Sequence, residues 1–143
     1  MKAYIIMEKG FEYDDNNYNP VDGGTPRKVF FTLKDAEKEL TTLEIEHVKT
    51  INVSDFMQYE MEDDLNVEKE EFESYVKSLN DKYGLPPKKN SWDRVGEHQL
   101  NPKATYEESI KYLQMISPKF FEIESVEVDI PSLRDYQISQ VLS

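Results

Sequence analysis

Two histidines and 29 carboxylates are the side chains of this chain best suited to proton transfer near neutral pH. His98 follows Glu97 in an irregular segment, and an imidazole beside a carboxylate can act as a general acid or base. No nucleophile motif completes such a site, so an exposed loop histidine is the favoured interpretation. Carboxylate pairs are too numerous for the sequence to single out a catalytic one. A small hydrolase-type enzyme that uses carboxylates with His98 is the alternative function left open.

Residues 14–17 (Asp-Asp-Asn-Asn) cluster oxygen ligands that could bind a hard cation. An EF-hand loop that starts at Asp14 needs glycine at its sixth position and glutamate at its twelfth. Those positions hold Asn19 and Thr25, and solvated turn residues explain the same composition. The chain has no cysteine and no glycine-rich phosphate loop. The sequence therefore predicts no metal site and no cofactor.

Negative charge is concentrated in one part of the chain. The formal net charge is -12, and residues 55–81 hold ten acids against two lysines. Such a surface repels nucleic acid and anionic membranes and attracts cationic partners. Exposed helix faces of soluble proteins are often acidic without having any partner. The sharper hypothesis is an inhibitor surface that presents spaced carboxylates to a basic partner protein, with the contact residues Glu68, Glu70, Glu71 and Glu73.

Residues 86–94 form a second candidate surface, and it is basic. The segment reads Pro-Pro-Lys-Lys-Asn-Ser-Trp-Asp-Arg and contains the only tryptophan of the chain. Tryptophan and arginine are enriched among residues that dominate binding energy, and prolines stiffen a backbone before binding. Under the alternative interpretation the tryptophan fills the core from a loop and the lysines are solvated. The partner-binding hypothesis names Lys88, Lys89, Trp92 and Arg94.

Secondary structure in the first third is predicted as a strand, a loop, a second strand and a helix. Residues 2–9 and 28–32 are rich in β-formers, whereas Asp, Asn, Gly and Pro in residues 11–26 predict a loop. Thr32 and Asp35 resemble a capping box. The helix that follows is expected to place four residues on one face: Ala36, Leu40, Leu43 and His47. His47 is therefore expected to be a partly buried core residue.

Two more helices and a strand are predicted in the remainder. Asn66 is expected to cap a helix that ends at Gly84, and residues 56–61 fit either a strand or a helical turn. A capping box at residues 105–108 opens a helix whose predicted apolar face holds Tyr106, Ile110, Leu113 and Ile116. A strand is predicted over residues 119–130, with a bulge at residues 125–126 and a short helix from Pro131.

These elements predict a single α+β domain over residues 1–143, with a small antiparallel sheet of about three strands and helices packed on one face. The apolar run at the N-terminus is too short for a signal peptide, and no 18-residue apolar stretch occurs. We therefore expect a cytoplasmic protein. The favoured function is a non-enzymatic inhibitor, immunity or regulatory factor that binds a protein and neither nucleic acid nor a membrane. The oligomeric state is left open.

Overall fold

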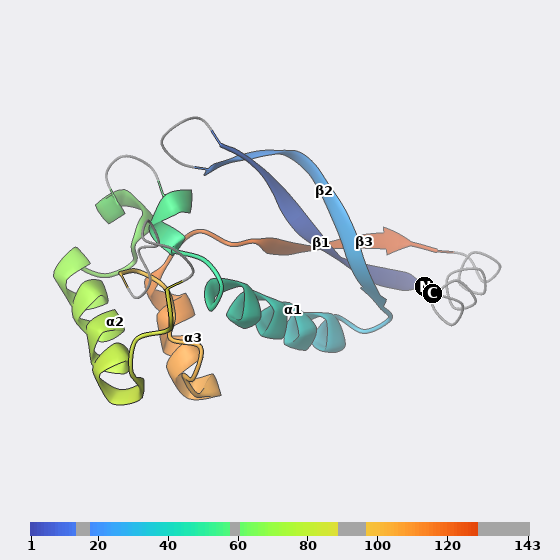
Figure 1. Cartoon of the computed structure of the whole chain (residues 1–143). Coiled ribbons are helices and arrows are strands. Elements are labelled where there is room, and N and C mark those ends of the chain that lie inside the picture. The colour runs from blue at the N-terminus through green and yellow to red at the C-terminus, as the bar shows by residue number, and fades with distance from the viewer. Residues whose placement is uncertain (14–17, 58–60, 89–96, 129–143) are drawn as a thin grey trace.

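The computed structural model describes residues 1–13, 18–57, 61–88 and 97–128. The predicted α+β fold is confirmed: three antiparallel strands form one sheet in the order β2-β1-β3, and helices accompany it. The strands are β1 (Lys2–Tyr13), β2 (Tyr18–Phe30) and β3 (Phe121–Glu127). α1 (Leu33–Val48) runs along one face of the sheet, while α2 (Lys69–Tyr83) and α3 (Tyr106–Met115) lie beyond one end of α1 (Figure 1).

The predicted loop over residues 11–26 is wrong, because most of it belongs to a long β-hairpin. β1 continues to Tyr13 and β2 starts at Tyr18, with register shifts after Ile6 and after Lys9. β2 is an outer strand, and proline is tolerated there because one side of the strand has no ladder partner. Gly24 also fits this pairing, since a Cβ atom on it would lie 2.7 Å from the carbonyl oxygen of Glu8.

α1 begins as predicted at Thr32, whose hydroxyl accepts a hydrogen bond from the backbone N–H of Asp35 at 3.3 Å. Its buried residues are Ala36, Glu44, Ile45 and Val48. Leu40 and Leu43 are only half-buried. The apolar stripe that the sequence predicts is therefore turned partly away from the core, and a glutamate occupies a buried position.

α2 begins at Lys69 with Glu68 in the capping position, so the predicted cap at Asn66 is wrong. The Asn66 side chain donates instead to the backbone carbonyls of Gln114 and Ile116, at 3.1 and 3.2 Å. A long-range contact thus takes the place of the local cap. The end of the helix is predicted correctly, because Gly84 follows it with a φ of 86°.

Two short 3-10 helices connect α1 to α2: η1 (Val53–Phe56) and η2 (Met61–Asp64). Of the segment 56–61, for which the sequence allowed either a strand or a helical turn, Phe56 lies in η1 and Met61 lies in η2.

α3 has the predicted capping box, in which Thr105 and Glu108 satisfy each other's backbone N–H groups. Its predicted apolar face is only partly right: Ile116 is buried and Leu113 packs against the core, whereas Tyr106 is 64% exposed. The buried residues within the helix are Ser109, Tyr112 and Met115. The helix is rotated so that the Tyr112 ring packs on Phe72 of α2, with ring centroids 5.5 Å apart. Packing against α2 has therefore determined which face is buried.

β3 pairs with β1 in an unbroken register from Phe121 to Glu127, so the predicted bulge at residues 125–126 is wrong. The change in apolar alternation has another cause. Phe121 and Ile123 join the core, whereas Val126 lies on the other face of the strand and is 36% exposed. The predicted helix from Pro131 lies outside the described residues. None of the helices in the described ranges is long and apolar enough to cross a membrane.

Candidate functional site

The acidic segment predicted as a partner surface follows η1, η2 and α2. Glu68, Glu70 and Glu71 lie at the capping position and in the first turn of α2, and all three are exposed. They make no ion pair or hydrogen bond with their side chains within the part of the chain that is described. Negative charge at a helix N-terminus also stabilises the helix dipole, so these residues have a structural role beside any role in binding.

Glu73 differs from these three carboxylates because it has a partner. Its Oε2 lies 3.0 Å from Nε2 of His98, and its side chain is 42% exposed. Glu73 therefore supports the fold at a contact that a binding partner would have to leave intact.

His98 is buried, with 6% of its surface exposed, so the predicted exposed loop histidine is wrong. Its ring stacks on Phe72 at a centroid distance of 6.0 Å and an interplanar angle of 16°. Its backbone carbonyl accepts a 2.6 Å hydrogen bond from the hydroxyl of Tyr112. His98 is thus held between α2 and α3. Sequence spacing could not show this, because both partners are distant along the chain.

The His98–Glu73 pair has one property of a general acid–base site and lacks another. The two side chains are within hydrogen-bonding distance. Nδ1 of His98 is buried and makes no hydrogen bond, within the ranges described. A catalytic histidine must present one nitrogen to a substrate, and here one nitrogen contacts Glu73 and the other is enclosed. The pair as built supports packing better than proton transfer.

The basic segment is described only in part. Lys88 is exposed, and Lys89, Trp92 and Arg94 lie outside the described residues. The hypothesis that this segment binds a partner stays a prediction. The acidic cluster at residues 14–17 also lies outside the described residues. Within the ranges given above, no group of three or more His, Asp or Glu side chains could hold a metal ion.

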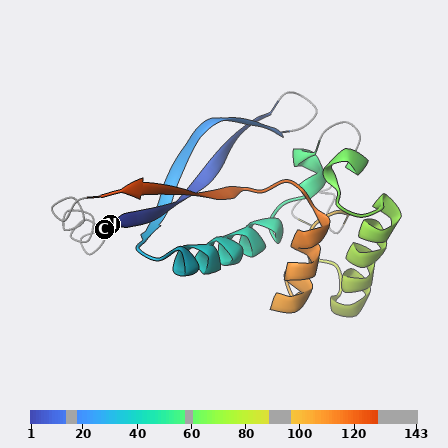
Figure 2. The same ribbon diagram turned by 180° about the vertical axis from the view of Figure 1, so that it is seen from behind.

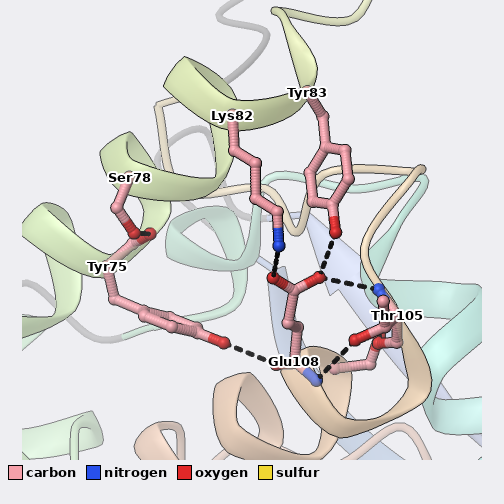
Figure 3. A network of polar contacts seen from close by, with 7 residues as sticks. Tyr75, Ser78, Lys82, Tyr83, Thr105 and Glu108 are labelled. Atoms are coloured by element: carbon pink, nitrogen blue, oxygen red, sulfur yellow. Dashed lines mark hydrogen bonds and ion pairs between the residues drawn. The ribbon is translucent and has the colours of Figure 1, made fainter.

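A polar network joins α2 to α3 around Glu108 (Figure 3). Its Oε1 accepts from the hydroxyl of Tyr83 at 2.6 Å and from the backbone N–H of Thr105 at 2.9 Å. Its Oε2 accepts from Nζ of Lys82 at 3.1 Å, and its backbone carbonyl accepts from the hydroxyl of Tyr75. The Thr105 backbone bond, followed by the bonds from Tyr83 and Lys82, lowers the pKa of Glu108 to about 2.

Replacing Glu108 with glutamine should change how stability depends on pH. The lowered pKa means that the carboxylate stabilises the wild-type protein fully above about pH 4.5. That contribution is lost as the pH falls toward 2. We expect Glu108→Gln to lower the melting temperature at pH 7, with a difference from wild type that shrinks between pH 4.5 and 3. Glu107→Gln is the matched control in the same helical turn, and a Glu108→Gln difference that does not change with pH would contradict the assignment.

Glu44 is a polar residue that the sequence analysis missed. It is 4% exposed, and its Oε1 accepts from the backbone N–H groups of Phe120 and Phe121, both at 2.9 Å. Its Oε2 is buried without a hydrogen-bond partner in the described part of the chain. Burial raises the pKa of Glu44, against the opposing effects of the two N–H groups, Lys119 and Lys9. The available signal was a glutamate one helical turn after Leu40, within the apolar stripe of α1.

His47 is half-buried beside the aromatic cluster where β1 approaches η1. Its ring lies 4.5 Å from that of Phe120, measured between centroids. Burial lowers its pKa, and the nearby carboxylate of Glu8 opposes this effect. A pocket of about 280 Å³ adjoins the ring and is lined mainly by aromatic side chains. His47 is therefore the partly buried residue that its place in the apolar stripe predicts.

Three comparisons, with family models, with curated proteins and with solved structures, gave no match for this chain. Functional inference therefore depends on the charges, contacts and cavities described above.

Proposed function

We propose that this protein is a non-enzymatic interaction protein, acting as an inhibitor, immunity or regulatory factor, that binds a basic partner protein through the first turn of α2. The observation that carries the proposal is the state of Glu68, Glu70 and Glu71. These carboxylates are exposed and make no ion pair with any described residue. They therefore keep their charge available for a cationic surface, whereas Glu73 and Glu108 already have partners.

Electrostatic attraction of this kind has a measurable dependence on salt. Raising the ionic strength from about 0.05 to 0.5 M shortens the screening length from roughly 14 to 4 Å. We expect association with the partner to slow by about tenfold, with a smaller change in dissociation, because exposed charges act mainly on the encounter rate. Surface plasmon resonance at several salt concentrations would measure both rates.

The partner can be recovered by affinity capture from the native host and identified by mass spectrometry. Glu68→Gln/Glu70→Gln/Glu71→Gln should lose the partner, because it removes the three unpaired charges while leaving the Glu73–His98 contact in place. The control Glu37→Gln/Glu46→Gln/Glu107→Gln removes three exposed charges from α1 and α3, including one in the first turn of a helix. Equal capture by the wild type and both variants would reject the proposed surface.

The alternative hydrolase-type enzyme is supported by one observation, the 3.0 Å contact between His98 and Glu73. Three pockets formed by described residues, one between α1 and α3, one beside His47 and one between α2 and α3, do not include His98 in their lining. The interaction protein is the better supported function because its carboxylates are already exposed, whereas the histidine would need a rearrangement to meet a substrate.

A further inference from the structure

The two outer strands of the sheet differ in how well they could accept an additional strand. β2 pairs with β1 through two register shifts and contains Pro20 and Pro26, features that blunt an edge against further pairing. β3 pairs with β1 at seven consecutive positions without a shift. Figure 2 shows β3 running along the sheet from the connection that follows α3, with α1 below it. The regular edge is therefore the outer side of β3.

The register identifies which backbone groups lie on that outer side. Hydrogen bonds from Lys9 N–H to the Phe120 carbonyl and from Val128 N–H to the Met1 carbonyl fix the alternation. In an antiparallel ladder, even-numbered residues of β3 then bond to β1 and odd-numbered residues point outward. The outward N–H of Phe121 is taken by Glu44. Within the described residues, the open groups of this edge are those of Ile123, Ser125 and Glu127.

The two faces of the sheet differ in their chemistry beside this edge. On the face away from α1, Glu122 and Glu124 are exposed and unpaired within the described ranges. On the face toward α1, a groove of about 650 Å³ separates α1 from α3, and Phe121 forms part of its wall. The apolar side chains from the helical side of this groove are those of Leu40 in α1, Ile110 and Leu113 in α3, and Ile116 directly after α3.

We propose that the outer edge of β3 binds an extended segment of a partner protein in which basic and apolar residues alternate. The segment adds a fourth strand, and main-chain hydrogen bonds to Ile123 and Ser125 supply affinity that does not depend on its sequence. Successive side chains of a strand point to opposite faces. Its basic residues lie beside Glu122 and Glu124, and its apolar residues face the groove between α1 and α3.

A second copy of this chain is a poor occupant of the edge. Pairing β3 with β3 of another molecule would bring glutamates of the two strands close together, and like charges on neighbouring strands are destabilising. Charged residues on an outer strand also guard against self-association. The same glutamates therefore disfavour a homodimer and favour a cationic strand.

The probe for this proposal is a fluorescent nine-residue peptide of alternating lysine and valine, followed by fluorescence anisotropy with the full-length protein. We expect saturable binding that weakens about tenfold or more when alternate backbone nitrogens of the peptide are methylated, because methylation removes hydrogen bonds and keeps the charge. A peptide of the same composition with its alternation scrambled should also bind at least about tenfold more weakly.

Ser125→Pro tests the protein side of the contact. The Ser125 N–H points outward, so proline removes an edge donor without removing a bond to β1. We expect binding of the alternating peptide to fall by about tenfold. Glu122→Lys/Glu124→Lys should abolish binding of the lysine peptide and permit binding of its glutamate counterpart.

A variant at the start of α2 distinguishes binding at the β3 edge from the function proposed above. Glu68→Gln/Glu70→Gln/Glu71→Gln should change binding of the alternating peptide by less than about twofold, since those carboxylates lie on α2, away from this edge. Equal binding of the methylated and unmethylated peptides would overturn strand addition whether or not any protein variant folds. Sedimentation as a dimer that Ser125→Pro converts to a monomer would overturn the choice of a cationic partner in favour of a second copy.

Discussion

Replacing Glu44 with alanine is expected to lower the free energy of unfolding by about 3 kcal/mol. Glu44 provides the acceptor for two buried backbone N–H groups, those of Phe120 and Phe121. Alanine would leave both donors without a partner, and a buried donor left unsatisfied costs about 1–3 kcal/mol. Urea denaturation followed by far-UV circular dichroism would measure the change. The matched control is Glu46→Ala on the exposed face of α1, with an expected change within about 0.5 kcal/mol.

The contribution of Glu44 should also depend on pH in a direction that its burial determines. Because burial raises its pKa, the native state holds the proton more tightly than the unfolded chain. The stability that this group contributes is therefore largest at low pH and declines as the pH rises through the raised pKa. Glu44→Gln keeps an acceptor oxygen and does not titrate. We expect wild type to lose stability relative to Glu44→Gln as the pH rises from 4.5 to 7.5.

The pH dependence expected for Glu44 is opposite in direction to that expected for Glu108. Each glutamate therefore serves as a control for the other. Stability curves measured at the same pH values would show Glu108 contributing more toward neutral pH and Glu44 contributing more toward acid. A Glu44→Ala variant as stable as wild type would contradict the assignment of its Oε1 as the acceptor for the start of β3. Parallel pH curves for wild type and Glu44→Gln would contradict the raised pKa.

Local signals in the sequence predicted helix ends well where the cap is made by neighbouring residues. The side-chain cap at Thr32, the capping box at Thr105 and the stop at Gly84 need only the residues that surround them. Asn66 failed as a predicted cap because its side chain bonds to carbonyls about 50 residues later in the chain. The strand pairing of residues 11–13 with residues 18–20, and the rest of β2 up to residue 26, were missed for a related reason. Turn-forming residues are compatible with an outer strand once β1 supplies a partner.

The candidate sites were harder to predict because they depend on which elements meet. Charge along the sequence identified Glu68, Glu70 and Glu71, whose exposure follows from their place at the start of a helix. It could not distinguish Glu73, which has a partner in His98. The edge of β3 required strand order and register, and neither is encoded in the composition of residues 121–127. Tertiary contacts therefore decide whether a given glutamate caps a helix, forms an ion pair, accepts hydrogen bonds in the core or stays exposed.

Replacing His98 with alanine is the second large effect that we expect, a loss of about 2–3 kcal/mol in the free energy of unfolding. The imidazole fills a buried position against Phe72 and contacts Glu73, so its removal creates a cavity and an unpaired carboxylate. Two controls separate these contributions. Glu73→Gln should cost no more than about 1 kcal/mol, because Glu73 is partly exposed. Tyr112→Phe should cost about 1–2 kcal/mol, because it removes one buried hydrogen bond to the His98 carbonyl.

The same measurement bears on whether His98 is a structural or a catalytic residue. Groups selected for catalysis are often held at the expense of stability, so replacing them tends to be neutral or stabilising. A structural histidine behaves in the opposite way, since its packing and its hydrogen bond are lost together. Guanidinium chloride unfolding of wild type and His98→Ala at pH 7 would measure the structural contribution of His98. A clear loss of stability would support the structural role of His98, whereas an unchanged or increased stability would contradict that role and leave His98 and Glu73 as candidates for an acid–base pair.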